Sequence, residues 1–285
     1  MTDIKHPCVF LPSLFLCGVT TLVVGCSTAP SSGAPPVPRE PARFTYGPFS
    51  ETYAIVSHTH QEQELGGQIT TVEYALRWRM TASTDPSGGE AGLTMTIDSA
   101  PTITGTAMDL RQGDLARAAG TKFVGTLSAE GRVEGLQGGD TTNTFLQQLA
   151  QSAERFFPRV PAGGAAPGQH WTDTLSTTTN SGGLEIHIEF VSHSEATGWI
   201  DRDGTRALEV ASVTDYSLAG GGTQMGAEID LEGTGSRHGI AYLAADGRFL
   251  GSISADTSNM TATVAAMGMM VPIVQMRHDT VAVVR

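Results

Sequence analysis

The sequence contains almost no cysteine and almost no lysine. Its three cysteines, Cys8, Cys17 and Cys26, all lie near the N-terminus, so disulfide bonds play no part in the fold of residues 27–285. Beyond the N-terminus, Lys122 is the one lysine that remains. The formal net charge of -12 at pH 7 repels phosphate backbones, and no basic stripe interleaved with aromatic residues is present. The composition therefore argues against nucleic-acid binding.

Recognisable cofactor motifs are also missing. The sequence has no Walker loop, no Rossmann fingerprint, no EF-hand loop and no HExxH, so it predicts no cofactor. The most apolar run, residues 9–24, is interrupted by Pro12 and by serine and threonine, and it is too short for a confident membrane span of about 20 apolar residues. What is present is 285 residues, 40% of them hydrophobic, which suffice for the core of one large domain or two modest ones.

The N-terminus has the layout of an export signal. Lys5 and His6 precede the apolar run 9–24. The run ends in Leu22-Val23-Val24-Gly25-Cys26-Ser27, which resembles the lipobox of bacterial lipoprotein precursors. That resemblance implies a signal peptide over residues 1–25, cleavage after Gly25 and acylation of Cys26 on its sulfur and its new amino group. An ordinary signal peptide that happens to contain a cysteine, or an uncleaved anchor, are the alternatives.

The lipobox resemblance also implies a location. Several acyl chains, at about 0.8 kcal/mol per buried CH2, would anchor the chain stably to a membrane. Ser27, in place of the aspartate that retains lipoproteins at the inner membrane, implies the outer membrane, facing the periplasm or the cell surface. Residues 26–43, the lipidated cysteine followed by a stretch rich in proline, serine and alanine, read as a semi-extended tether.

Beyond the tether the dominant hydrophobic period is two. Val72, Tyr74, Leu76, Trp78 and Met80 alternate with polar or small residues, which predicts a half-buried antiparallel strand. Gly-containing turns separate further segments of this kind. The predicted strands are residues 53–64, 71–80, 93–98, 123–127, 171–179, 184–193, 206–215, 225–233, 238–243, 249–256, 260–265 and 271–284.

An internal duplication is indicated by LSAEGRVEGL at Leu127 and LAADGRFLGS at Leu243. Their separation, 243 minus 127, is 116 residues, and the same offset carries Gly66-Gly67 onto Gly182-Gly183. We interpret the repeated acid-Gly pair as a tight hairpin turn, since glycine accepts a positive φ, and we expect the following Arg132 and Arg248 to stay in water. The duplication predicts one β-rich domain, residues 44–285, with halves of about 44–165 and 166–285.

One amphipathic helix is predicted at about residues 143–157. Thr144 and Gln147 have capping-box spacing, apolar residues from Phe145 onward recur at helical intervals, and Pro158 stops the pattern. The predicted fold is mainly β (α+β): a twisted or curved antiparallel sheet, or two sheets, with this helix packed on a concave face or across an open end. The outline resembles uncharacterised β-rich bacterial lipoproteins and, distantly, half-open barrels of the lipoprotein-carrier type.

The clearest polar cluster is the HxH segment. On a strand, His58, His60, Glu62 and Glu64 share one face, so two imidazoles and a carboxylate could hold a borderline metal such as zinc. A solvated strand face is the alternative interpretation. An enzyme would need a cluster assembled from distant segments, for instance His58, His60 and His170.

Other candidate groups have plain structural explanations. His187 and His193 read as surface residues of one strand, and Ser236 with His238 lacks the strand-to-helix elbow of serine hydrolases. The C-terminal methionines are consistent with core, with an apolar-ligand surface or with a Cu(I) site. These are Met260, Met267, Met269, Met270 and Met276.

The sequence thus predicts a membrane-anchored envelope lipoprotein, non-enzymatic, that binds an apolar ligand or another envelope protein. A passive structural or assembly lipoprotein, and an enzyme or metal-binding protein, are the alternatives.

The anchor is directly testable. Cells grown with labelled palmitate should incorporate label into the wild-type chain. Cys26→Ala should remove the label, because the lipobox resemblance places the acylated thiol at this cysteine alone. Cys17→Ala is the matched control and should leave labelling intact. Label retained by Cys26→Ala would exclude the lipobox interpretation.

Overall fold

The computed structural model describes residues 42–285 with the exception of 86–90, 106–111, 141–142, 182 and 225. The expected signal peptide, Cys26 and all but the last two residues of the expected tether lie outside the described residues. Among the helices described, none is long and apolar enough to cross a membrane.

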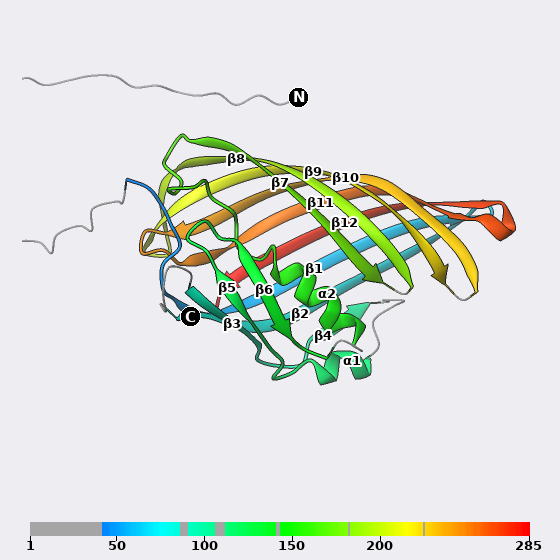
Figure 1. The fold of residues 1–285 in the computed structure, drawn as a ribbon, viewed down its shortest axis with the longest axis horizontal. Helices are drawn as coiled ribbons and strands as arrows, with labels where there is room; N and C mark the ends of the chain where they lie inside the picture. Colours follow the sequence, from blue (N-terminus) through cyan, green and yellow to red (C-terminus); the bar gives the residue numbers. More distant parts are fainter. Residues whose placement is uncertain (1–41, 86–90, 106–111, 141–142, 182, 225) are drawn as a thin grey trace, which may run out of the picture. The chain divides into compact units, whose positions relative to one another are not determined.

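The described chain forms one curved, unclosed antiparallel sheet of twelve strands (Figure 1). Neighbouring strands follow the order β6-β5-β3-β2-β1-β12-β11-β10-β9-β8-β7, and β4 pairs with β2 off this path. The strands are β1 Ser50–Leu65, β2 Gln68–Asp85, β3 Ala91–Ile97, β4 Thr102–Gly105, β5 Lys122–Leu127, β6 Val133–Gly138, β7 His170–Ser181, β8 Leu184–Arg202, β9 Thr205–Gln224, β10 Ala227–Ala244, β11 Phe249–Val264 and β12 Met269–Val283. The predicted mainly β fold with a curved antiparallel sheet is confirmed.

Several strands are longer than predicted. The two segments expected at 225–233 and 238–243 form the single strand β10, and those at 249–256 and 260–265 form β11. Gly235, read as part of a break, lies inside β10, where a Cβ atom would meet Cζ of Tyr216 at 2.2 Å. This glycine makes room for a ring on the neighbouring strand rather than turning the chain.

The amphipathic helix α2 spans Thr144–Ala153 and is therefore shorter than the predicted helix at 143–157. The predicted capping box at Thr144 and Gln147 is wrong by one residue. Asn143 is the N-cap, and its side-chain oxygen accepts a hydrogen bond from the Leu146 amide at 3.2 Å. Past Ala153 the turn tightens, since the Phe156 amide bonds back three residues to the Ala153 carbonyl at 3.1 Å. Pro158 disfavours helical geometry in the residue before it, so Phe157 belongs to the following turn.

Four short elements were not predicted: a first helix, the strands β4 and β6, and a 3-10 helix at Ala265–Met267. The helix α1, Gln112–Arg117, spans six residues and is too short to show helical periodicity. It contributes Leu115 to the core. The strand β4 has four residues, and Gly105 at its end lies against the Glu73 backbone.

The strand bounds agree with the 116-residue offset in two pairs and depart from it in three. β2 begins at Gln68 and β8 at Leu184, and β6 begins at Val133 and β11 at Phe249, so each of these two pairs is 116 residues apart. β7 begins 120 residues after β1, β9 114 after β3 and β10 105 after β5, so the duplication stays a prediction. The strands of both halves run across the sheet in order of decreasing number. The first half gives β6-β5-β3-β2-β1, the second gives β11-β10-β9-β8-β7, and β12 lies between them.

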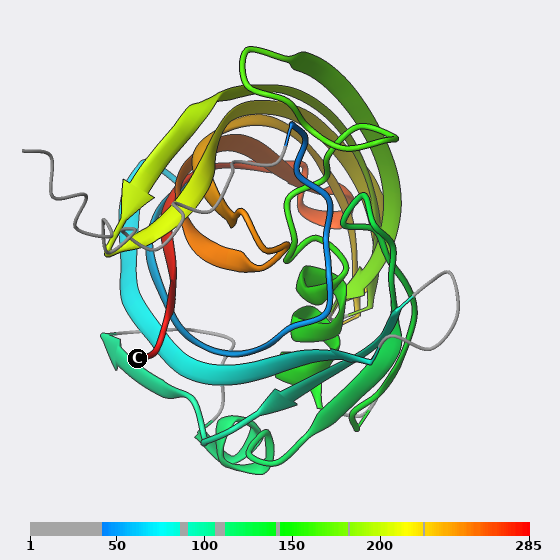
Figure 2. The same cartoon turned by 90° about the vertical axis from the view of Figure 1, so that its left-hand side faces the viewer.

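Both repeated turns contact one N-terminal segment, residues 44–49, which we call the strap. The Tyr46 amide donates to the Ala129 carbonyl at 3.0 Å, and the Gly47 amide donates to the Gly247 carbonyl at 3.1 Å. Figure 2 shows the strap, in dark blue, crossing this end of the sheet. We call it the strap end, and the opposite end, where β1–β2, β7–β8, β9–β10 and β11–β12 turn, the hairpin end.

The turns behave as predicted, but one arginine does not. Gly131 and Gly247 have φ values of 84° and 92°. Arg248 bonds to Glu51 on β1 and to Asp246 at 2.8 Å, so it ties the turn to the sheet instead of standing free in water.

The strap end is filled by aromatic side chains. Phe156 and Phe157 lie with ring centroids 5.0 Å apart, and Phe156 lies 5.2 Å from Tyr53 and 5.5 Å from Phe249. Tyr46 contacts Phe157 at 5.8 Å and donates its hydroxyl to the Pro158 carbonyl at 2.8 Å. Edge-to-face pairs of this kind add about 0.5–1.5 kcal/mol each to the burial of their area.

The contact between strap and turn can be tested at Gly247. A Cβ atom there would lie 2.5 Å from the Gly47 nitrogen, so Gly247→Ala must displace the strap, whereas Gly204→Ala has the same positive φ and open space. We expect Gly204→Ala to cost about 1–2 kcal/mol of unfolding free energy and Gly247→Ala about 1–3 kcal/mol more. Urea unfolding measures the free energy of both variants. Equal losses of stability would contradict the contact between the strap and the turn at Gly247.

Candidate ligand-binding site

The two faces of the sheet differ. We call the face that packs against α2 and the aromatic residues the inner face, and its reverse the outer face. At the strap end the inner face is closed, because Tyr53, Leu208 and Leu243 are fully buried there.

Toward the hairpin end the inner face is apolar but not filled. On β8, Ile186 and Ile188 are half-buried while Glu185 and Glu189 on the outer face are exposed. The alternation of half-buried and exposed residues continues on β9 to β12, although the exposed outer residues Met270, Val274 and Met276 of β12 are themselves apolar. None of the inner side chains packs against the core cluster of the described chain. The set, which we call the apolar rows, comprises Leu184, Ile186, Ile188, Leu218, Ile229, Leu231, Met260, Ala262, Val264, Met269, Val271 and Ile273.

A pocket of about 220 Å³ lies between the closed end and the apolar rows. One wall is the segment after α2, and the other is the inner face of β7 to β11. Its lining includes Arg155, Phe156, Phe190, Tyr216, Arg237 and Asp256.

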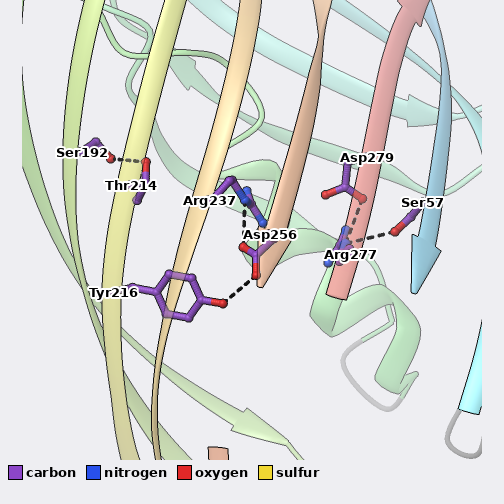
Figure 3. Close-up of polar contacts among 8 residues, drawn as sticks. All are labelled: Ser57, Ser192, Thr214, Tyr216, Arg237, Asp256, Arg277 and Asp279. Atoms are coloured by element: carbon purple, nitrogen blue, oxygen red, sulfur yellow. Dashed lines mark hydrogen bonds and ion pairs between the residues drawn. The ribbon is translucent and has the colours of Figure 1, made fainter. Parts of the chain in front are cut away.

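A charged group forms the floor of this region (Figure 3). The Asp256 carboxylate is buried and accepts hydrogen bonds from Arg237 Nε at 3.1 Å and from the Tyr216 hydroxyl at 2.7 Å. Burial, and then the hydrogen bond to Asp256, raise the pKa of Tyr216 to about 12. Tyr216 therefore stays protonated and donates to Asp256 at physiological pH.

Arg277, one strand further on, also has a carboxylate partner. Its Nε donates to Asp279 at 2.8 Å and to the Ser57 hydroxyl at 3.0 Å, as Figure 3 shows. Arg237 and Arg277 are therefore neutralised by Asp256 and Asp279 respectively.

Arg155 differs from both. Its guanidinium carbon lies 4.6 Å from the centroid of the Phe190 ring, and in the described chain it has no ion pair. Although much of the residue is solvent-accessible, the protein atoms around the guanidinium lower its pKa, and the charge of Arg237 lowers it further. The arginine remains charged, since its pKa in water is above 12.

The predicted HxH cluster lies on the outer face of β1, away from this pocket. His58 and His60 do share a face, and His60 Nε2 lies 3.3 Å from Glu62 Oε1. Within the described residues, no three histidine, cysteine, aspartate or glutamate side chains are grouped closely enough to hold a metal ion. His170 lies on the edge strand β7, which five strands separate from β1, so it does not join His58 and His60.

The outer face does carry a histidine row that the sequence did not reveal. Strand pairing brings His193, His238, His278 and His58 into one transverse line, with Val213 between the first two and Ala255 between the next two. No local spacing predicts this line, because the register of long-range strand pairs creates it. His187 and His193 are exposed on β8, as predicted.

The remaining candidates are ordinary strand residues. Ser236 and His238 lie on β10, with no strand-to-helix turn between them. Met267, Met270 and Met276 are exposed by 69%, 69% and 41%, so the interpretation as core is wrong for these three, whereas Met260 and Met269 are half-buried.

Comparisons with known proteins leave the family open. No family model matches the chain, and no curated protein matches it. Among solved structures, DynF from the dynemicin biosynthesis pathway of Micromonospora chersina aligns at 11% identity over 88% of this chain and 86% of its own, with a TM-score of 0.22. Pseudomonas aeruginosa OccK2 (OpdF) aligns at 6% identity over 83% of this chain and 98% of its own, with a TM-score of 0.27. Likenesses this distant carry no argument about function.

Proposed function

We propose that the protein is a lipid-anchored envelope lipoprotein, without enzymatic activity, whose inner face binds an apolar ligand. The single observation that carries this proposal is the set of half-buried apolar rows beyond the closed end of the sheet.

The alternation along β8 supports the proposal. A strand with polar residues on one face and continuous apolar residues on the other is built for burial of the apolar face. The apolar rows are half-buried and contiguous, and a contiguous apolar surface that stays partly open to solvent typically marks an interaction site. Covering it would be favourable by roughly 25 cal/mol per Å² of apolar area removed from water.

A ligand explains the inner face better than a passive structural role. A passive lipoprotein needs both faces of its sheet either solvated or filled by its own side chains. Here the closed end is filled by Phe156, Phe157 and their neighbours, whereas the apolar rows are not. The lipobox resemblance at Cys26 supplies the membrane attachment in this proposal, and the tether supplies reach.

Another envelope protein remains the second candidate, for a different surface. The outer face holds a shallow groove that includes exposed Val213, Ile240 and Ile253 beside His193 and His238. A partner on this groove would leave the inner face free for a ligand.

Binding to the apolar rows can be measured with N-phenyl-1-naphthylamine, a neutral probe that fluoresces in apolar surroundings. The full chain carrying Cys26→Ala should bind the probe, and Ile188→Glu should weaken binding about tenfold or more, because it places a charge among the apolar rows. Val191→Glu, on the same strand but the outer face and 39% exposed, is the matched control and should bind normally.

Circular dichroism verifies that each variant is folded. Equal probe binding by Ile188→Glu and Val191→Glu would contradict the proposed site.

A further inference from the structure

We infer that the ligand is an anionic amphiphile, whose negatively charged head group pairs with Arg155 and whose hydrocarbon chain extends along the apolar rows. The inference rests on the proposed function and adds the chemical class and the orientation of the ligand.

The charge balance of the pocket points to an anion. Three arginines line the pocket, and two of them have a carboxylate partner: Arg237 pairs with Asp256, and Arg159 pairs with Asp173 at 2.8 Å. The third, Arg155, interacts with the charge of Glu154, its neighbour in the chain, but forms no ion pair within the described residues. The side chains that line the pocket therefore carry one more positive than negative charge, in a protein whose net charge is -12.

The position of Arg155 favours a ligand over water as its partner. Its guanidinium lies on the Phe190 ring, which holds the side chain in place and removes part of its hydration. A cation held this way pairs strongly with a carboxylate or phosphate, since charge-assisted bidentate hydrogen bonds fit the planar guanidinium.

The buried carboxylate on the pocket floor is already paired and is not left free for a cationic head group. Both oxygens of the buried Asp256 carboxylate are engaged, one by Arg237 and the other by Tyr216. Burial and this hydrogen bond keep the Tyr216 proton in place, so the hydroxyl adds no negative charge.

The volume of the pocket indicates that it holds the head group of the ligand and that the chain lies outside it. About 220 Å³ is less than the 300–1,000 Å³ or so of a pocket that encloses a whole small ligand, so this pocket holds one end of a longer molecule. From Ser192, beside the charged floor, to Leu184 at the hairpin end, β8 advances eight residues, about 26 Å at the usual rise. Phe190 and Tyr216, with ring centroids 5.5 Å apart, lie between the pocket and the apolar rows.

The test compares ligands that share one chain and differ in head group. Hexadecanoate, hexadecyl phosphate and hexadecanol compete with N-phenyl-1-naphthylamine for the full chain carrying Cys26→Ala. We expect the two anions to displace the probe at about one tenth of the concentration that the alcohol needs, as a charged hydrogen bond implies. The ratio between carboxylate and phosphate then identifies which anion the site prefers.

Variants at Arg155 assign that preference. In Arg155→Gln the anions and the alcohol should displace the probe at about the same concentration, while the probe itself still binds. Arg155→Lys should keep most of the preference for anions. Arg202→Gln is the matched control, because Arg202 also lies on an aromatic ring, 3.5 Å from the centroid of Tyr242, but does not line the pocket. It should keep the full preference.

The outcomes separate the two proposals. Failure of the wild-type inner face to bind the probe would overturn the proposed function itself. Probe binding with no anion preference, or a preference that Arg155→Gln leaves unchanged, would overturn the assignment of Arg155 and leave apolar binding intact.

Discussion

The strands of this sheet are longer than the hydrophobic core that covers their inner face, and the exposed remainder determines what the protein can bind. β8 has 19 residues and β9 has 20, but the buried aromatic cluster and the strap occupy one end of the sheet. Tyr46, Phe157 and Phe249 close that end by edge-to-face contacts. A sheet face must be buried against something to be stable. The apolar rows at the other end are not covered by any part of the chain that the structure describes.

The charged floor marks the transition between these two regions. Asp256 is buried and satisfied by Arg237 and Tyr216, and this arrangement costs little because both carboxylate oxygens accept hydrogen bonds. On the strap side of this group the inner face is closed, and on the hairpin side it is apolar and half-exposed. A ligand with a polar end and an apolar end matches this sequence of surfaces along one strand.

Local sequence patterns predicted most of the strands and the main helix. The lengths of the strands and the contacts between distant side chains depend on long-range packing, which local patterns do not show. The alternation from Val72 to Met80, the positive φ of Gly131 and Gly247 and the capped start of α2 follow from local chemistry. The fusion of two predicted segments into β10 does not, since Gly235 serves the ring of Tyr216 on another strand. The contact of Arg155 with Phe190 is equally invisible in the sequence, where 35 positions separate them. The predicted metal candidates His58, His60 and Glu62 share a face as expected, but metal binding there stays a prediction.

The orientation of a bound amphiphile tests the account most directly. Amide spectra of the protein can be recorded with a fatty acid that carries a nitroxide either near its carboxyl group or near its methyl end. We expect the nitroxide near the carboxyl group to broaden the signals around Thr214 and Arg237. The nitroxide near the methyl end should broaden those around Ile186 and Leu231, near the hairpin end. Broadening that follows the outer face, or that is the same for both labels, would contradict it.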